Sequence, residues 1–314
     1  MSLTVSDLII PILVYQGSLK DLIVPDQERI PILISSSDKI CSQVDELVRK
    51  GISDILLFGL PHKRNESGTG AADEAGAVQI AVKNIKQAFG SSVNVITDVC
   101  VCQYNFSGHC GISDNNGRVV HNFKSLHLLN KIATSHADSG ADCVAPSSMM
   151  DGQVYSIRQA LDANGFRTVK IMSYSAKHAS SLYGPFRSVA FDKSGSSNIT
   201  LDKSTYQLPY SNRREAIREI EQDINEGADM VMIKPAFWYL DLVYEVKQII
   251  DVPLVVQIVS GEYLMFRKDM REEIKCNRIN EFIESLISVK RAGSDKLITY
   301  ISMDLLGYFT KSLY

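Results

Sequence analysis

No run in this chain approaches the roughly 20 consecutive apolar residues that a membrane-spanning helix needs. No charge sign dominates either: 33 Lys and Arg residues against 36 Asp and Glu residues give a net charge of −3, without the basic footprint of nucleic-acid binding. The first residues lack the basic segment and apolar stretch of a secretion signal. We therefore expect a cytoplasmic protein that binds neither membranes nor nucleic acids. An apolar content of 45% excludes a disordered chain.

Cysteine is also scarce, and its spacing is informative. Three of the six cysteines fall within eleven positions, Cys100, Cys102 and Cys110. A C-x-C pair is a poor disulfide, and clustered cysteines in a reducing compartment indicate a metal site or catalysis. The segment DVCVCQYNFSGHC also contains His109, so the spacing allows a four-ligand structural zinc or a three-ligand catalytic zinc. Inert buried thiols and redox chemistry are the alternatives. The other three cysteines are expected to be small core or helix residues: Cys41, Cys143 and Cys276.

Continuous apolar or β-branched runs predict parallel strands that are covered on both faces. They lie at residues 8–15, 54–60, 93–99, 142–146, 169–175, 230–235, 253–259 and 296–302. Amphipathic segments between them, such as 71–89 and 212–227, have helical spacing. Short turns ending in aspartate precede four of the strands, in KGISD, SGADC, EGADM and AGSDK. This alternation predicts an α/β fold, a (β/α)₈ TIM barrel, with a doubly wound open sheet as the alternative.

The length of 314 residues suits one elaborated barrel domain over residues 1–314. Two segments are not required by a barrel. The first is a polar N-terminal arm within about residues 1–30, which begins to depart from the strand pattern after the first apolar run. The second is the Ser-, Gly- and Lys-rich stretch at about 188–207. Long polar loops in compact enzymes are often lids, so we expect an active-site lid there.

Barrel enzymes carry their active sites at the carboxyl ends of the strands. Those ends supply the following polar side chains: Asp98, Ser147, Lys177, Lys234, Ser260 and Tyr300. Lys234 lies in MVMIKPAFWYL, which contains no other charged residue. Burial there lowers an amine pKa, and a neutral amine is the nucleophile that forms Schiff bases with carbonyls. A phosphate- or carboxylate-binding role and a structural ion pair are the alternatives.

Six segments together resemble the porphobilinogen synthase (5-aminolevulinate dehydratase) family, of the zinc-dependent, cysteine-rich type. They occur in family order from about residue 8 to 308: DVCVCQYNFSGHCGI, APSSMMDGQV, IMSYSAKHASSLYGPFR, EGADMVMIKPAFWYLD, VSGEYLM and KRAGSDKLITY. The resemblance implies a (β/α)₈ barrel with an extended N-terminal arm that embraces a neighbouring subunit, in a homo-octamer. It implies condensation of two 5-aminolevulinate molecules to porphobilinogen, with loss of two waters, in tetrapyrrole (haem) biosynthesis.

The resemblance also implies roles for individual residues. Lys234 matches the lysine that forms the Schiff base with the first substrate, and Lys177 matches the lysine that engages the second. The three clustered cysteines match a catalytic Zn²⁺ site with an open position, which leaves His109 outside the ligand set. Asp98 matches a residue that assists acid–base steps near the second substrate. The remaining matches are substrate-binding residues: Ser147, Arg187, Lys203, Gln207, Ser260 and Tyr300.

Several positions depart from the family pattern. Lys203 stands where an arginine usually binds substrate carboxylate, and lysine loses the bidentate fork, so we expect an active enzyme with a raised KM. Three other departures have no assigned effect: Ser148, Gln257 and Phe123. Glu219 falls near a position that binds an activating Mg²⁺ in some members. The alternatives to the synthase are an aldolase-like Schiff-base barrel and a weak or silent relative that binds metal and a carboxylate ligand.

Overall fold

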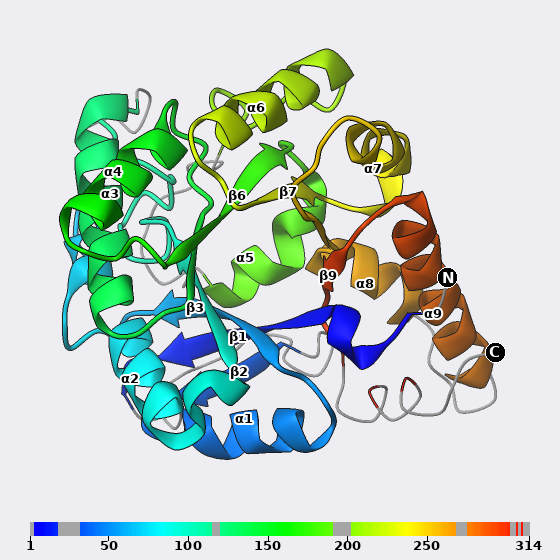
Figure 1. Ribbon diagram of the computed structural model, residues 1–314, viewed down its shortest axis with the longest axis horizontal. Helices are drawn as coiled ribbons and strands as arrows, with labels where there is room; N and C mark the ends of the chain where they lie inside the picture. Colours follow the sequence, from blue (N-terminus) through cyan, green and yellow to red (C-terminus); the bar gives the residue numbers. More distant parts are fainter. Residues whose placement is uncertain are drawn as a thin grey trace.

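Nine parallel strands form one sheet in the computed structural model, which describes residues 3–17, 32–114, 120–190, 202–267, 275–301, 306 and 309 (Figure 1). The strands are β1 (Leu8–Tyr15), β2 (Leu33–Ser36), β3 (Asp54–Leu60), β4 (Asn94–Val99), β5 (Cys143–Pro146), β6 (Lys170–Lys177), β7 (Met230–Lys234), β8 (Leu254–Gln257) and β9 (Lys296–Ile298). Neighbours in the sheet follow chain order from β3 to β9, and β1 pairs with both β3 and β9. The sheet therefore closes into a barrel.

Strand β1 closes the barrel along two edges. One edge pairs with β3 from Ile9 to Tyr15. The other edge pairs at its start with β9, where Leu8 lies opposite Leu297, and at its end with β2. The predicted eight-stranded barrel is confirmed, and the open doubly wound sheet is wrong because the first and last strands are paired. Strand β2 was not predicted, since its four residues, LISS, are too short and too polar to give a strand pattern.

The described residues form nine α-helices, and most of them lie around the barrel in the view of Figure 1. They are α1 (Ile40–Arg49), α2 (Ala77–Phe89), α3 (Asn122–Asp138), α4 (Gln153–Ala163), α5 (Gly184–Ala190), α6 (Arg213–Asn225), α7 (Leu240–Lys247), α8 (Ser260–Arg267) and α9 (Lys275–Ala292). The predicted helix at 212–227 is α6, and the Asn212 side chain accepts a hydrogen bond from the Glu215 amide at its start. The segment 71–89 becomes helical only at Ala77, because a 3₁₀ turn (Thr69–Ala72) precedes it.

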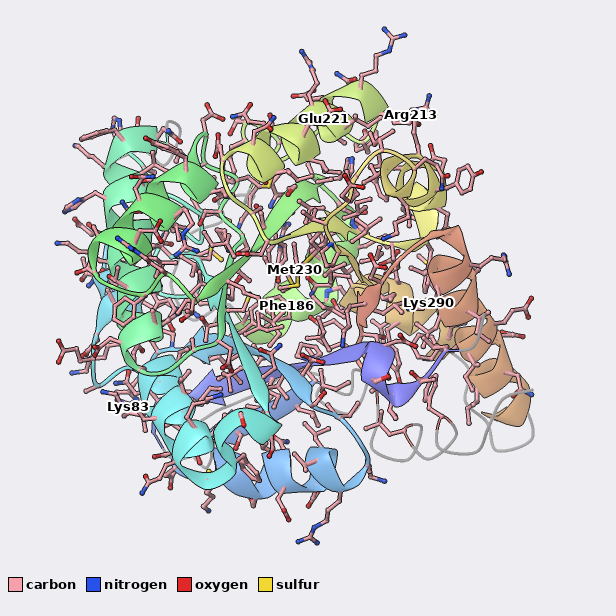
Figure 2. All side chains as sticks on the ribbon, viewed as in Figure 1. Lys83, Phe186, Arg213, Glu221, Met230 and Lys290 are labelled. Atoms are coloured by element: carbon pink, nitrogen blue, oxygen red, sulfur yellow. The ribbon has the colours of Figure 1, made fainter. Side chains whose placement is uncertain are left out.

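Short helix α5 takes a different place from the outer helices. In Figure 1 it lies inside the ring of strands in projection, and Figure 2 shows its Phe186 near the middle of that ring. By contrast, Lys83, Arg213 and Glu221 lie at the periphery (Figure 2). Helix α5 packs against α8, so these two short helices stand over one end of the barrel.

The aspartates of the predicted turns connect neighbouring strands at the amino end of the barrel. Asp142, just before β5, accepts a hydrogen bond from the Val95 amide of β4 at 2.7 Å. Asp229 does the same for β6 through the Ile171 amide at 2.8 Å. Asp295 accepts from the β8 amide of Leu254 at 2.7 Å. Each carboxylate thus satisfies a backbone donor that a strand start would otherwise leave unpaired.

Parts of the predicted arm and lid lie outside the described residues. These are residues 1–2 and 18–30 of the arm and 191–201 of the lid. In the part of the chain that the structure describes, no helix combines the length and apolar character needed to cross a membrane.

Gly59 of β3 is required by close packing against the loop that carries the cysteines. A Cβ atom at Gly59 would overlap the Tyr104 hydroxyl and lie 2.9 Å from Val78 Cγ2. We predict that Gly59→Ala lowers the free energy of unfolding by about 1–3 kcal/mol through overpacking, measured by urea denaturation. Gly70→Ala is the matched control, since its Cβ would make only an ordinary 3.8 Å contact with the same Tyr104. Equal stability of the two variants would contradict the packing argument.

Candidate active site

Two lysines face each other across neighbouring strands at the carboxyl end of the barrel. Lys177 ends β6 and is in register with Lys234, which ends β7. Their Nζ atoms lie 5.4 and 5.2 Å from the centroid of the same ring, Tyr174. Lys234 also lies 5.2 Å from the centroid of Tyr183. The negative faces of these rings partly compensate two cations held close together in a buried place.

The Lys234 amine is the group most altered by this arrangement. Burial and, after it, the neighbouring charge of Lys177 together lower its pKa to about 7, while Asp98 opposes the shift. An amine with that pKa is about half neutral at pH 7. It is therefore available as a nucleophile at neutral pH, which an ordinary lysine is not.

Lys177 and Asp98 both line the site. The Lys177 ammonium donates a hydrogen bond to the Ser147 carbonyl. Asp98, near the end of β4, is buried and accepts a hydrogen bond from the side-chain amide of Gln103 at 3.5 Å. Burial raises the pKa of Asp98, and Ser147 and the two ammonium groups act in the opposite direction. A carboxyl with a raised pKa beside amines is placed to exchange protons with them.

One cavity joins the residues singled out from the sequence. The predicted catalytic and substrate-binding residues that line it are Asp98, Ser147, Lys177, Arg187, Lys203, Gln207, Lys234, Ser260 and Tyr300, together with Cys102. Six further lining residues had no predicted role: Phe58, Gln103, Tyr174, Tyr183, Phe186 and Val259. Five of the six belong to the quoted family segments, whereas Phe58 comes from an ordinary apolar strand.

Other predicted residues of the cavity come from the two short helices α5 and α8 and from the loop before α6. Ser260, the first residue of α8, is buried and its hydroxyl accepts a hydrogen bond from the Phe186 amide at 2.9 Å. The Arg187 guanidinium lies 5.3 Å from the Tyr183 ring centroid. Gln207 is buried, and its Oε1 has no hydrogen-bond partner among the described residues. These polar groups converge on one cavity from α5, α8 and the loop before α6.

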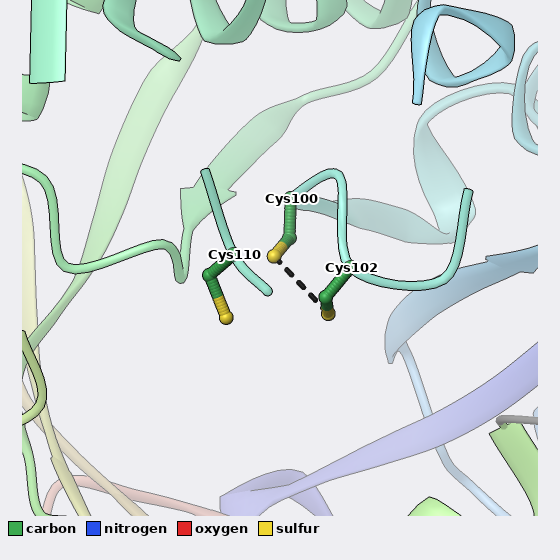
Figure 3. A group of neighbouring side chains, drawn as sticks. All are labelled: Cys100, Cys102 and Cys110. Carbon is green, nitrogen blue, oxygen red and sulfur yellow. Dashed lines mark hydrogen bonds between the residues drawn. The ribbon is translucent and has the colours of Figure 1, made fainter. Parts of the chain in front are cut away.

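Three thiols form a buried cluster at one wall of this cavity (Figure 3). The sulfur atoms of Cys100, Cys102 and Cys110 all lie within 4.8 Å of one another, and those of Cys100 and Cys102 are 3.3 Å apart. A disulfide needs about 2.05 Å, so the thiols are free. Three sulfurs at tetrahedral Zn–S distances of about 2.3 Å would be roughly 3.8 Å apart. The donor set therefore fits a soft divalent metal such as zinc.

His109 is directed away from the thiol cluster. Its Nδ1 lies 3.1 Å from the Tyr206 hydroxyl, which also accepts a hydrogen bond from the Cys110 amide at 3.2 Å. The cluster that can hold a metal among the described residues contains the three cysteines without this imidazole. Of the two arrangements that the spacing allowed, the three-ligand one is therefore the one the geometry favours.

Lys203 reaches the thiol cluster from the described end of the predicted lid. Its buried ammonium donates a hydrogen bond to Cys110 Sγ at 3.2 Å. Burial acts against the charged amine, but the sulfurs of the cluster outweigh it and raise the Lys203 pKa. The pKa of the Cys110 thiol is held well below its usual value by hydrogen bonds from Cys100 and Cys102 and by this lysine. Lys203 therefore borders both the cavity and the thiols.

The departures from the family pattern fall in different places. Ser148 is buried and donates to the Val99 carbonyl at 3.5 Å, and Gln257 is buried with both amide atoms unpaired among the described residues. Phe123 is 84% exposed on α3, away from the cavity. Glu219 lines a second cavity beside Asp223 and other acidic groups. Burial and these carboxylates raise the pKa of Glu219.

A closed parallel barrel with a buried lysine pair and a thiol cluster at its carboxyl end defines a barrel enzyme suited to carbonyl chemistry. The family model described as "Delta-aminolevulinic acid dehydratase" matches residues 1–308, and the chain belongs to this family. The delta-aminolevulinic acid dehydratase of Methanothermus sociabilis is 44% identical over 309 residues, covering 97% of this chain and 92% of the relative. That of Archaeoglobus fulgidus is 45% identical over 283 residues, covering 90% and 83%.

A solved structure has the same fold. It is delta-aminolevulinic acid dehydratase (porphobilinogen synthase) from Toxoplasma gondii ME49 in complex with the reaction product porphobilinogen. The two structures superpose with a TM-score of 0.89 at 34% sequence identity, over 99% of this chain and 87% of the other.

The lowered pKa of Lys234 predicts a pH-dependent reactivity. Reductive methylation with formaldehyde and cyanoborohydride should label Lys234 faster as pH rises through about 7, since only the neutral amine reacts. Lys177→Met should move this midpoint to higher pH, because the like charge that disfavours the Lys234 ammonium is removed. Peptide mass spectrometry measures the labelling, and Lys83→Met, exposed on α2, is the control. A midpoint near the ordinary lysine value of about 10.4 would contradict the assignment.

Proposed function

We propose that this protein is a porphobilinogen synthase, which condenses two 5-aminolevulinate molecules to porphobilinogen with loss of two waters. The observation that carries the proposal is the lysine pair, Lys177 and Lys234, in one cavity with Asp98 and bordered by three thiols. An aldolase-like enzyme needs only one Schiff-base lysine. A second lysine in register with the first favours an enzyme that handles two keto substrates.

The first substrate binds covalently to Lys234. The neutral amine adds to the ketone carbon, and the ketone oxygen leaves as water once it is protonated, which produces a Schiff base. The hydroxyls of Ser260 and Tyr300, which both line the cavity, hold the carboxylate of this substrate. Lys234 therefore acts on the ketone of the first substrate, while Ser260 and Tyr300 bind the carboxylate of the same molecule.

The second substrate engages Lys177, with its carboxylate near the cations of Arg187 and Lys203. One carbon–carbon bond and one carbon–nitrogen bond join the two substrates. The carbon–carbon bond forms at the former ketone carbon held by Lys234, and the Lys234 amine is then released. The two waters lost in the whole reaction carry the two ketone oxygens, and the first of them leaves when the Schiff base on Lys234 forms. Asp98, buried between the lysines and the thiols, takes up and returns the protons that these steps require. Gln207 and Ser147, which line the same cavity, supply hydrogen bonds to the second substrate.

Cys100, Cys102 and Cys110 would hold a catalytic Zn²⁺ with an open fourth position. When bound, zinc supplies Lewis-acid polarisation of a substrate oxygen or amine. Lys203, whose ammonium donates a hydrogen bond to Cys110 Sγ, offsets part of the negative charge of three thiolates. Zinc is the fitting metal because soft sulfur ligands favour it over magnesium or calcium.

Other features of the proposal concern the whole protein. The chain is a single elaborated barrel with an N-terminal arm and a lid at about residues 188–207, and it acts as a homo-octamer in the cytoplasm. Glu219 and its acidic neighbours would hold an allosteric Mg²⁺, a hard cation that prefers oxygen ligands.

The catalytic proposal predicts that purified protein with zinc converts 5-aminolevulinate to a pyrrole, detected colorimetrically. Lys234→Met should lower kcat by about three orders of magnitude or more, because the covalent route is lost. Lys83→Met should retain wild-type turnover, since this lysine is exposed on α2. No pyrrole from the wild-type protein would refute the proposal, and adduct formation without pyrrole would favour the aldolase-like alternative.

The metal proposal predicts about one zinc per chain by elemental analysis after dialysis. Cys102→Ser should weaken zinc binding by more than the about 10–100-fold typical of losing an outer-shell partner. Cys41→Ser is the control, because Cys41 lies half-buried on α1 outside the cluster. Chelation should abolish pyrrole formation and added zinc should restore it. Turnover that survives complete removal of zinc would refute a catalytic role for the metal.

A further inference from the structure

Glu262 is a fully buried carboxylate that none of the proposed steps uses. It lies in the first turn of α8, directly after Ser260 and Gly261. Its oxygens accept hydrogen bonds from three backbone amides: Ala236 at 2.9 Å, Phe237 at 2.6 Å and Val259 at 2.8 Å. A charged acceptor that takes three backbone donors in a buried place is a strong and directional anchor.

The three donors belong to two different loops of the site. Ala236 and Phe237 follow Lys234 where the chain leaves β7. Val259 immediately precedes Ser260 where the chain leaves β8, and it lines the cavity. One side chain therefore connects the backbone beside the proposed Schiff-base lysine to the backbone beside the proposed carboxylate-binding serine.

Packing around Glu262 leaves these loops little freedom. A Cβ atom at Gly261 would lie 2.8 Å from Leu182 Cα, so the start of α8 is pressed against the 3₁₀ turn Ser181–Tyr183. The Tyr183 ring from that turn lies 5.2 Å from Lys234 Nζ. Burial raises the pKa of Glu262 to about 7, while the three amides and the charge of Lys234 favour its ionised form.

We propose that Glu262 is a positioning residue that holds Lys234 and Ser260 at the spacing set by the two ends of the first substrate. The inference rests on the proposed function for what these two residues bind. A displacement of about 1 Å at a reacting group can cost about 100-fold in rate. A carboxylate suits this task because its two oxygens can accept from both loops at once, whereas an amide has one acceptor and a competing donor.

The test compares Glu262→Gln with a second variant that also loses a carboxylate accepting from a backbone amide. Glu262 accepts from Val259, just after the end of β8, and the second carboxylate accepts from the start of the same strand. Asp295→Asn is that control, because Asp295 accepts from the Leu254 amide at the start of β8, away from the cavity. We expect both variants to lose some thermal stability. Only Glu262→Gln should lower kcat, by about 30- to 100-fold, raise KM, and slow borohydride trapping of 5-aminolevulinate on Lys234 in proportion.

Two further measurements keep the inference falsifiable. Glu262→Asp keeps the charge but shortens the side chain, and it should give a smaller loss of trapping if Glu262→Gln fails to fold. Hydrogen exchange should show faster exchange at Ala236 and Phe237 in both Glu262 variants. Trapping and kcat within about twofold of Asp295→Asn, at equal loss of stability, would overturn the positioning role. Wild-type protein that is trapped on Lys234 but forms no pyrrole would refute the proposed function, and the effect of Glu262 on trapping would still decide this inference.

Discussion

Closure of the parallel sheet through β1 and β9 is the constraint on which the rest of the structure depends. The pairing of Leu8 with Leu297 and of Ile9 with Ile298 joins segments almost 290 positions apart. Because all strands run in one direction, closure brings every carboxyl end to one mouth and every amino end to the other. Stabilising carboxylates such as Asp142 gather at the amino end, and reactive groups gather at the opposite end.

The site owes its reactivity to charges that the barrel forces together. Lys177 and Lys234 share a register position, so burial and the charge of Lys177 both disfavour the ammonium form of Lys234. The strand scaffold tolerates this cost because its large apolar core supplies the stability elsewhere. Asp98 and the rings of Tyr174 and Tyr183 compensate part of the charge without neutralising it, which leaves a nucleophilic amine near neutral pH.

Local patterns predicted most of the fold. Each of the eight predicted strands is present because a strand buried on both faces is a continuous apolar run, as in LIIPILVY. Failures occurred where no such run exists. Strand β2 has two serines in four residues, and β6 continues to Lys177, beyond the apolar part of its segment. The family segments also pointed to residues of one cavity, whereas Phe58 carried no signal because its apolar side chain looks like any other core residue.

The sequence by itself determined most of the secondary structure elements, the family and the residue types available for chemistry, since these depend on neighbours along the chain. Only the tertiary structure decided which groups meet. It places His109 in contact with the Tyr206 hydroxyl and the Lys203 ammonium in contact with Cys110 Sγ. It also buries Glu262 between two loops whose backbone amides it accepts from. None of these contacts follows from spacing, because each joins segments whose separation in space is set by barrel closure and packing and not by their distance along the chain.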